Sequence, residues 1–388
     1  MKSKTTFAVF VTLALLQGTP ALSAEDFAVT TIRVPNGGIQ PQVQTDSRGR
    51  VHMIYFTGDP LRGDVYYVRS DDGGSSFIAP LRVNSQPRSA IAIGTVRGPH
   101  LAVGKGDRPH VAWMGSDRAQ PKAEGKAIPM LYSRLNDAGD GFEAQRNVIH
   151  QHVGLDGGGS VAADSDGNVY LAWHAPDRGN DEADRRVWIV RSHDNGKTFD
   201  AETAALPLQT GACGCCGMNI AASRKGQVYV LFRSAKQMVN RDIYLLASKD
   251  QGRTFEVLST DPLKIGICVM STAGFAAAGD GVVAAWETQN QIRVMRLDGA
   301  ESGVANIISP PGRGGDRKHP CVAANARGEF IVAWAEGTGW NKGGSVAWQV
   351  FDNQGRPEAG RFGRADGLPA WDAPAAFAGP DDSFRIVF

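Results

Sequence analysis

The feature that most constrains the fold is a pair of apolar stretches that recurs along the whole chain. In each copy, a short stretch ending in small residues is followed by a turn containing Gly or Asp. A second stretch then ends in an aromatic residue. The terminal aromatics are Phe56, Trp113, Trp173, Phe232, Trp286, Trp334 and Phe388, with steps of 57, 60, 59, 54, 48 and 54 residues. This regular spacing predicts a repeat protein in which each copy is a β-hairpin.

Further strands are expected beyond each hairpin. A third stretch of β type follows several copies, for example at residues 64–70, 186–192 and 242–248. Four-stranded units at this period are typical of β-propeller blades. Seven hairpins therefore predict an all-β propeller of seven blades, with six as the alternative count. The last hairpin, 375–388, lacks outer strands, and residues 27–34 could complete its blade and close the ring.

The N-terminal segment has the pattern of a secretory signal peptide. Two lysines precede an apolar run at residues 7–16, and small residues stand just before residue 25. We therefore expect residues 1–24 to be a signal peptide and residues 25–388 to form a single propeller domain. The apolar run is short for a membrane span, and no later segment could provide one. The sequence thus predicts a periplasmic or secreted protein without a membrane span after cleavage.

Overall charge gives no indication of a nucleic-acid partner. The formal net charge is +1, and charged residues make up 21% of the chain. The expected partners are instead a small molecule, a glycan or a metal ion.

A sharper motif, Ser-x-Asp-x-Gly-x-Ser/Thr-Phe, follows the third strand of three repeats. It occupies residues 70–77, 192–199 and 248–255, and a degenerate copy spans residues 133–142. In such a motif the Ser and Asp side chains bind turn amides, Gly supplies a positive φ, and Phe packs between strands. These carboxylates are therefore expected to be turn residues and not catalysts.

The motif resembles the Asp-box of the sialidase-like, BNR-repeat β-propeller family, and the resemblance covers nearly all of the chain after residue 24. It implies the propeller fold. The family's catalytic set consists of an arginine triad, a Tyr nucleophile with a Glu partner, and an Asp acid/base. Here the strand expected to begin that set reads Gln40-Pro41-Gln42-Val43, and no Tyr follows Tyr244. These departures argue against conventional sialidase activity.

Propeller geometry indicates where a site would lie. Loops that lead into the innermost strands share one face with loops that leave the second strands, and the Asp-boxes lie on the opposite face. We call this face of the channel the mouth, and it is expected to gather Gln40, Arg97, His100, Asp156, His174, Met218, Arg233, Met270, Glu287, His319, Glu336, Trp340 and all five cysteines.

Three interpretations of the cysteines remain open. The first is disulfides between blade loops, for example between the Cys-x-Cys-Cys cluster and Cys268, with at least one thiol left over. The second is a soft-metal site for copper(I) or zinc(II), because closely spaced thiolates suit both ions. The third is a redox-active pair with Cys-x-x-Cys spacing. The candidate metal ligands are Cys213, Cys215, Cys216, Cys268, Met270 and His319.

The leading functional hypothesis is an exported propeller whose Cys/Met/His cluster holds a soft metal or is locked by disulfides around a ligand pocket. The enzyme alternative is a glycoside hydrolase, since paired carboxylates can act as acid and base. A protein-interaction scaffold is the third class. The candidate catalytic residues are Glu287, Glu336, Asp156 and Arg233, although the glutamates could instead form salt bridges with Arg233 or Lys318. The candidate ligand-binding residues are His100, Arg97, His174, Arg241 and Trp340.

Overall fold

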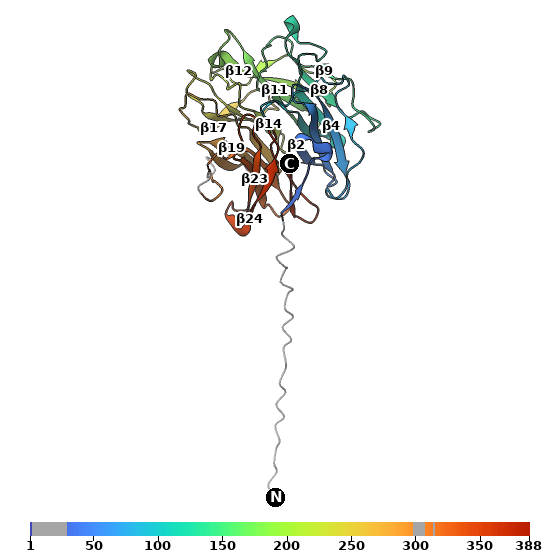
Figure 1. Cartoon of the computed structure of the whole chain (residues 1–388), viewed down its shortest axis with the longest axis vertical. Coiled ribbons are helices and arrows are strands. Elements are labelled where there is room, and N and C mark those ends of the chain that lie inside the picture. Colours follow the sequence, from blue (N-terminus) through green and yellow to red (C-terminus); the bar gives the residue numbers. More distant parts are fainter. Residues whose placement is uncertain (2–28, 298–306, 313–314) are drawn as a thin grey trace.

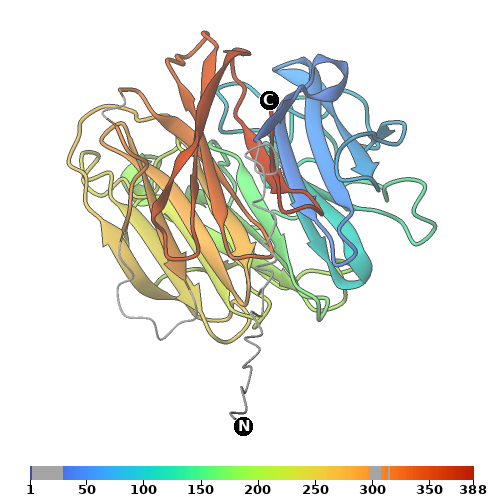
Figure 2. The same cartoon turned by 90° about the horizontal axis from the view of Figure 1, so that it is seen from below.

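Seven β-sheets form a propeller, which confirms the predicted all-β, seven-bladed architecture and excludes the six-bladed alternative. The computed structural model describes residue 1 and residues 29–297, 307–312 and 315–388. The sheets follow one another around a common axis in sequence order, as the colours of Figure 1 show, and Figure 2 shows the same sheets from below. The predicted signal peptide lies outside the described residues apart from Met1.

The first four sheets have four strands each. The first contains β2 (Ile39–Thr45), β3 (Val51–Asp59), β4 (Arg62–Ser70) and β5 (Leu81–Arg82). The second contains β6 (His100–Gly104), β7 (Arg108–Met114), β8 (Met130–Arg134) and β9 (Arg146–Asn147). The third contains β10 (Gly159–Ala163), β11 (Val169–Pro176), β12 (Arg185–Ser192) and β13 (Thr203–Ala204). The fourth contains β14 (Asn219–Ala222), β15 (Val228–Arg233), β16 (Ile243–Ser248) and β17 (Glu256–Asp261).

The remaining sheets are less uniform. The fifth contains β18 (Ala273–Ala278), β19 (Gly281–Thr288) and β20 (Gln291–Leu297). The sixth contains β21 (Lys318–Ala324), β22 (Phe330–Glu336), β23 (Gly344–Phe351) and β24 (Pro357–Leu368). The seventh contains β25 (Ala375–Ala378), β26 (Phe384–Val387) and β1 (Thr30–Ile32). Short 3-10 turns are η2 (Pro35–Gly37), η3 (Lys105–Asp107), η4 (Glu124–Lys126) and η5 (Glu182–Asp184). Among the described residues, no helix has the length and apolarity needed to cross a membrane.

The N-terminal strand closes the ring as expected. Strand β1 pairs in parallel with β26, with Thr31 opposite Ile386. The Phe388 amide donates to the Ile32 carbonyl oxygen at 3.1 Å, which extends the pairing to the last residue. The final hairpin therefore gains its third strand from the other end of the chain, which closes the ring.

The core lies between neighbouring blades. The strand-ending aromatics Trp113, Trp173 and Trp286 are at most 2% exposed. Trp113 packs in one cluster with Phe56 of the preceding blade, and Trp173 packs with Tyr132 of the blade before it. The repeated aromatic is thus the residue that joins one sheet to the next, and replacing one by Ala is expected to cost about 3 to 5 kcal/mol.

The three turns with the Ser-x-Asp-x-Gly pattern share one hydrogen-bond network. In residues 192–199, the Ser192 hydroxyl donates to Asp194 Oδ1 at 2.7 Å and accepts from the Gly196 amide at 2.8 Å. The Thr198 amide donates to Asp194 Oδ1 at 2.9 Å and its hydroxyl to Oδ2 at 2.6 Å. Partial burial acts to raise the pKa of Asp194, but these bonds outweigh it and lower the pKa to about 2. The carboxylate is fully used by the turn.

The equivalent bonds recur around Asp72 and Asp250, and Phe199 packs edge-on against Tyr132 with ring centroids 5.0 Å apart. The degenerate copy differs, since the Ser133 hydroxyl donates to the Glu143 carbonyl oxygen instead.

Candidate functional site

Residues that lead into the innermost strands converge on the propeller axis. They line a cavity of about 90 Å³ to which six of the seven blades contribute, as the propeller geometry predicted. Burial lowers the pKa of both histidines in this lining, to about 4 for His100 and about 3 for His319, so both are neutral at pH 7. The sequence-predicted residues in the lining are Gln40, His100, Met218, His319 and Cys321.

The backbone at this mouth is repeatedly strained. Five non-glycine residues have positive φ angles of 51 to 64°: Gln40, Thr95, Met270, His319 and Trp371. At Gln40 and His319 the strand pairing is also shifted, and a proline follows each of them. Such conformations are uncommon outside glycine and collect at functional sites. At these five positions the chain at the mouth departs from regular strand geometry.

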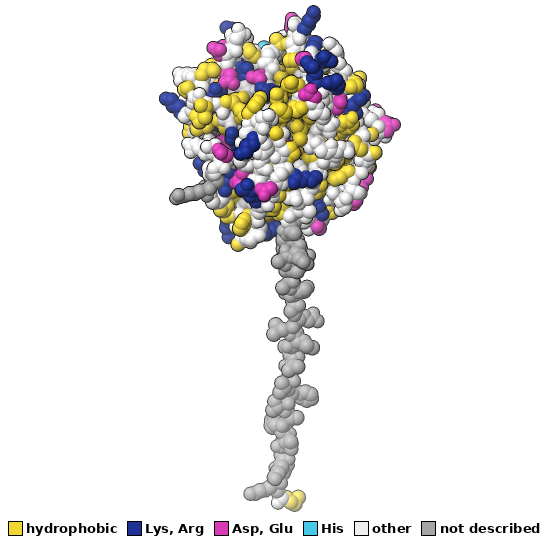
Figure 3. Space-filling model, in the orientation of Figure 1, with side chains coloured by type: hydrophobic (Ala, Val, Ile, Leu, Met, Phe, Trp, Pro, Cys, Tyr) yellow, Lys and Arg dark blue, Asp and Glu magenta, His cyan; other side chains and the backbone are white. Residues whose placement is uncertain are grey.

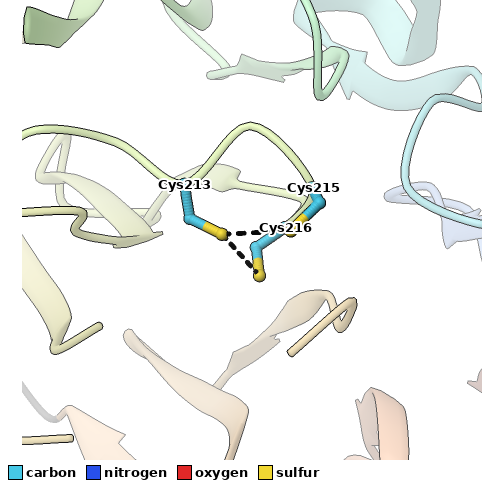
Figure 4. A group of neighbouring side chains, drawn as sticks. All are labelled: Cys213, Cys215 and Cys216. Atoms are coloured by element: carbon cyan, nitrogen blue, oxygen red, sulfur yellow. Dashed lines mark hydrogen bonds between the residues drawn. The ribbon is translucent and has the colours of Figure 1, made fainter. Parts of the chain in front are cut away.

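Three cysteine sulfurs gather in the loop between β13 and β14. Cys213 Sγ lies 3.2 Å from Cys216 Sγ and 3.4 Å from Cys215 Sγ, as Figure 4 shows. All three sulfurs lie within 4.8 Å of one another. The loop is anchored from both sides, because the Cys213 amide donates to the Arg233 carbonyl oxygen and the Gly217 amide to that of Ser271.

A disulfide links this loop to the next blade. Cys215 is bonded to Cys268, which precedes β18, and their Cα atoms are 6.5 Å apart. Cys213 and Cys216 remain free thiols and are buried with Val269. The fifth cysteine, Cys321, lies apart from the group as a free thiol in β21, where burial raises its pKa to about 12.

Charged groups surround the buried thiols. Arg233 Nη2 lies 2.9 Å from Glu287 Oε2, and both side chains are at most 2% exposed. The hydrogen bond from Cys213 lowers the pKa of Cys216 against the effect of burial, and the charge of Arg233 lowers it further. The same hydrogen bond, followed by burial, raises the pKa of Cys213. The pair therefore ionises first at Cys216, with Cys213 keeping the proton.

A second ion-pair network runs from the mouth to the cysteine loop. Arg97 Nη2 lies 2.8 Å from Asp156 Oδ1, and Arg185 Nη2 lies 3.3 Å from Asp156 Oδ2. Glu182 Oε2 lies 2.7 Å from Arg241 Nη1, and Glu182 Oε1 accepts from the Gly214 amide at 2.5 Å. This carboxylate therefore ties η5 to the cysteine loop.

His174 is enclosed beside that network. It is 1% exposed, and neither ring nitrogen has a hydrogen-bond partner among the described residues. Burial is the largest of the effects that lower its pKa to about 4. A Cβ placed on Gly157 would lie 2.6 Å from His174 Nε2 and 2.7 Å from the Gly214 carbonyl oxygen. Only glycine at position 157 lets the histidine and the cysteine loop approach this closely.

The remaining predicted site residues do not join the cysteine group. Glu336 accepts from Trp334 Nε1 at 2.8 Å and lies 3.5 Å from both Arg317 and Arg364. Met270 and His319 line a small pocket at the axis together with Trp340, which is 50% exposed. The six-residue set of Cys, Met and His expected from the sequence is thus divided between the cysteine loop and the axis.

Sequence reasoning missed one buried carboxyl at the mouth, Asp372. Its Oδ1 accepts from the Gln40 amide at 2.5 Å and from the Ala373 amide at 2.8 Å, but Oδ2 has no partner in the described part of the chain. Burial raises its pKa to about 7. Asp372 lies just before β25, the innermost strand of the seventh blade, and this position in the chain was the available signal.

Comparison with known proteins supports the fold and no finer assignment. No protein-family model matches the chain, and no curated protein matches it. A Dyadobacter fermentans protein of unknown function is 16% identical, with a TM-score of 0.50 over 88% of this chain and 97% of that one. The Penicillium chrysogenum alpha-L-arabinanase complexed with arabinobiose is 15% identical, with a TM-score of 0.51 over 83% and 95%.

A sialidase is also among the structural neighbours. The Trypanosoma rangeli sialidase in complex with 2,3-difluoro-KDN is 12% identical, with a TM-score of 0.51 over 85% of this chain and 56% of that one. At these identities the likeness concerns the fold alone, because propellers carry many unrelated activities. The resemblance noted from the sequence is therefore supported as a sialidase-like propeller fold.

Proposed function

We propose that this chain is an exported sialidase-like propeller that binds a soft metal ion, copper(I) or zinc(II), at its cysteine loop. The observation that carries the proposal is the group of three sulfurs within 4.8 Å of one another. In a tetrahedral zinc site with Zn–S bonds of about 2.3 Å, neighbouring sulfurs are about 3.8 Å apart. Cys213 Sγ lies 3.2 and 3.4 Å from the other two sulfurs, which is close to this value.

The ligand set fits soft ions because it consists of sulfur alone. Thiolates select copper(I) and zinc over magnesium and calcium, which prefer oxygen. Arg233 and Arg241 supply positive charge next to thiolates that would otherwise be costly to bury. Cys215 and Cys268 become available as the third and fourth sulfurs once the bond between them is reduced.

A metal titration of the fully reduced chain tests this function. We expect one copper(I) or zinc(II) per chain, and affinity reduced by more than about 100-fold in Cys213→Ser and Cys216→Ser, because each removes a ligand. Cys321→Ser is the matched control, since that thiol lies outside the group. A reduced chain that binds no metal, or ligand variants that bind like the control, would overturn the proposal.

Glycoside hydrolysis is the second candidate, and Asp372 is the observation that favours it. A carboxyl with a pKa of about 7 suits a general acid at neutral pH, and fold neighbours include an arabinanase and a sialidase. The carboxylates predicted from the sequence are paired with arginines, since Glu287 binds Arg233 and Asp156 binds Arg97 and Arg185, although burial also raises the pKa of Glu287. Arabinosides and sialosides should be tested with wild type and Asp372→Asn. Turnover that the variant loses supports the candidate, and absence of turnover rejects it.

Export is part of the proposal and rests on the N-terminal sequence. We expect the mature chain in the periplasm or the medium to begin at Glu25, after a signal peptide of residues 1–24. N-terminal sequencing of the protein from its native compartment checks this. Recovery of the intact N-terminus from the cytoplasm would contradict it.

A further inference from the structure

Solvent exposure decreases in order along four cysteines, from Cys268 through Cys215 to Cys213 and Cys216. Cys268 is exposed, Cys215 is half-buried, and Cys213 and Cys216 are at most 3% exposed. The oxidised pair lies on the outside and the reduced pair lies behind it. Ile267, next to Cys268, is 66% exposed, so the outer sulfur lies on an accessible part of the surface.

The sulfurs also form an unbroken series of contacts. Cys268 is bonded to Cys215, whose Sγ lies 3.4 Å from that of Cys213, which in turn lies 3.2 Å from that of Cys216. Thiol–disulfide exchange proceeds when a thiolate attacks a disulfide sulfur that it can reach. Cys213 touches both the disulfide and the second thiol, and so occupies the position of the exchanging residue.

We propose that these cysteines form an internal disulfide relay, which moves a disulfide between the exposed pair Cys215–Cys268 and the buried pair Cys213–Cys216. The relay uses the cysteines of the proposed metal site but does not require the metal. Its activity is thiol–disulfide exchange, and the partner it fits is a dithiol reductant that reaches the protein at Cys268.

The two steps balance without an external oxidant or reductant. In the first, the Cys213 thiol gives its proton to the Cys216 thiolate, the Cys213 sulfur bonds to Cys215 Sγ, and the electron pair of the broken bond leaves on Cys268. In the second, that proton passes to the Cys268 thiolate, the Cys216 sulfur bonds to Cys213 Sγ, and the electron pair leaves on Cys215. The proton first held by Cys213 thus ends on Cys268, and the negative charge moves from Cys216 to Cys215.

Both steps are reversible, so a disulfide held by Cys213–Cys216 returns to the exposed pair. An outside dithiol then reduces the Cys215–Cys268 disulfide, is itself oxidised to a disulfide, and leaves all four thiols free. If the proposed metal function holds, the relay also regulates it. While one disulfide is present, in either position, only two of the four sulfurs are free to bind a metal.

Disulfide mapping of the metal-free, full-length chain tests the relay. The reduced protein is given a stoichiometric amount of a disulfide-forming oxidant in the presence of a chelator. It is then held at mildly alkaline pH, quenched with acid, alkylated and analysed by mass spectrometry. We expect the wild type to contain Cys213–Cys215 and Cys213–Cys216 linkages besides Cys215–Cys268.

Variants separate the two steps. Cys216→Ser should stop at the Cys213–Cys215 linkage, Cys213→Ser should keep only Cys215–Cys268, and Cys321→Ser should behave like the wild type. A wild type that holds only the Cys215–Cys268 linkage at all times, with two free thiols in the loop, would overturn the relay. Because metal is absent throughout, that failure would be distinct from a failure of the metal titration.

Discussion

The two faces of the propeller differ in how similar the blades are to one another. On one face, the turns around Asp72, Asp194 and Asp250 repeat nearly the same hydrogen bonds, and their carboxylates are fully used. On the other face, which holds the mouth, each blade contributes different residues, and buried polar atoms such as Asp372 Oδ2 lack partners in the described residues. The repeated residues serve the fold, and those that do not repeat are the candidates for function.

The largest effect is expected from the buried ion pair at the mouth. Glu287→Leu leaves Arg233 as an uncompensated buried charge and should lower the free energy of unfolding by about 3 to 5 kcal/mol. Chemical denaturation of the variant and the wild type measures this. A loss below about 1 kcal/mol would mean that the pair is solvated, and would weaken the electrostatic account of the Cys216 thiolate.

Asp372 should make the stability of the protein depend on pH near neutrality. The turn carboxylates should not do so, because their pKa values are about 2. Its folded pKa of about 7 exceeds the ordinary 3.8, so its contribution to stability is complete below 3.8 and is lost as pH rises through about 7. Asp372→Asn cannot titrate and keeps an acceptor for the Gln40 amide. Its stability relative to the wild type should therefore rise with pH across this window in urea unfolding. Parallel pH curves for the two proteins would contradict the buried carboxyl.

The repeated turns should show a moderate effect confined to stability. Ser192 is buried and takes part in three hydrogen bonds, so Ser192→Ala should lower the free energy of unfolding by about 1 to 3 kcal/mol. Ser133→Ala, which removes one bond in the degenerate copy, is the matched control and should cost less. Equal losses for the two variants would show that the motif adds nothing beyond an ordinary turn.

The smallest effect on stability is expected from Trp340, an exposed residue at the mouth. Trp340 is 50% exposed in the loop between β22 and β23 and reaches Gly94 in the loop before β6. Trp340→Ala should change the free energy of unfolding by less than about 0.5 kcal/mol, as for other exposed positions. A loss above about 1 kcal/mol in thermal or chemical unfolding would make Trp340 a structural bridge across the mouth.

The structural features that repeat from blade to blade could be predicted from the sequence, whereas most of the contacts that occur only once could not. Blade number and the turns at residues 192–199 follow from patterns that recur every 48 to 60 residues, and the ring closure expected of residues 27–34 is made by β1 (Thr30–Ile32). The salt-bridge interpretation of Glu287 with Arg233 was also correct. The contacts of Glu182 with the cysteine loop depend instead on how two long loops fold against each other, and no local pattern specifies that.

The separation of Met270 and His319 from the cysteine loop has the same cause. Met270 lies two residues from Cys268 in the sequence, yet Met270 and His319 line the axial pocket, whereas Cys268 is bonded to the cysteine loop. Their positive φ angles alter the direction of the chain at these positions. Backbone conformations of this kind are uncommon for Met and His, and sequence alone does not reveal them.

X-ray absorption at the metal edge tests the central claim most directly. The claim is that the cysteine loop at the mouth binds a metal ion through its sulfur atoms. For the reduced, zinc-loaded chain we expect a shell of three or four sulfur atoms at about 2.3 Å. That shell should lose one sulfur in Cys216→Ser and none in Cys321→Ser. A shell made only of nitrogen and oxygen at about 2.0 to 2.1 Å would contradict the account, because the cysteine loop would then play no part in metal binding.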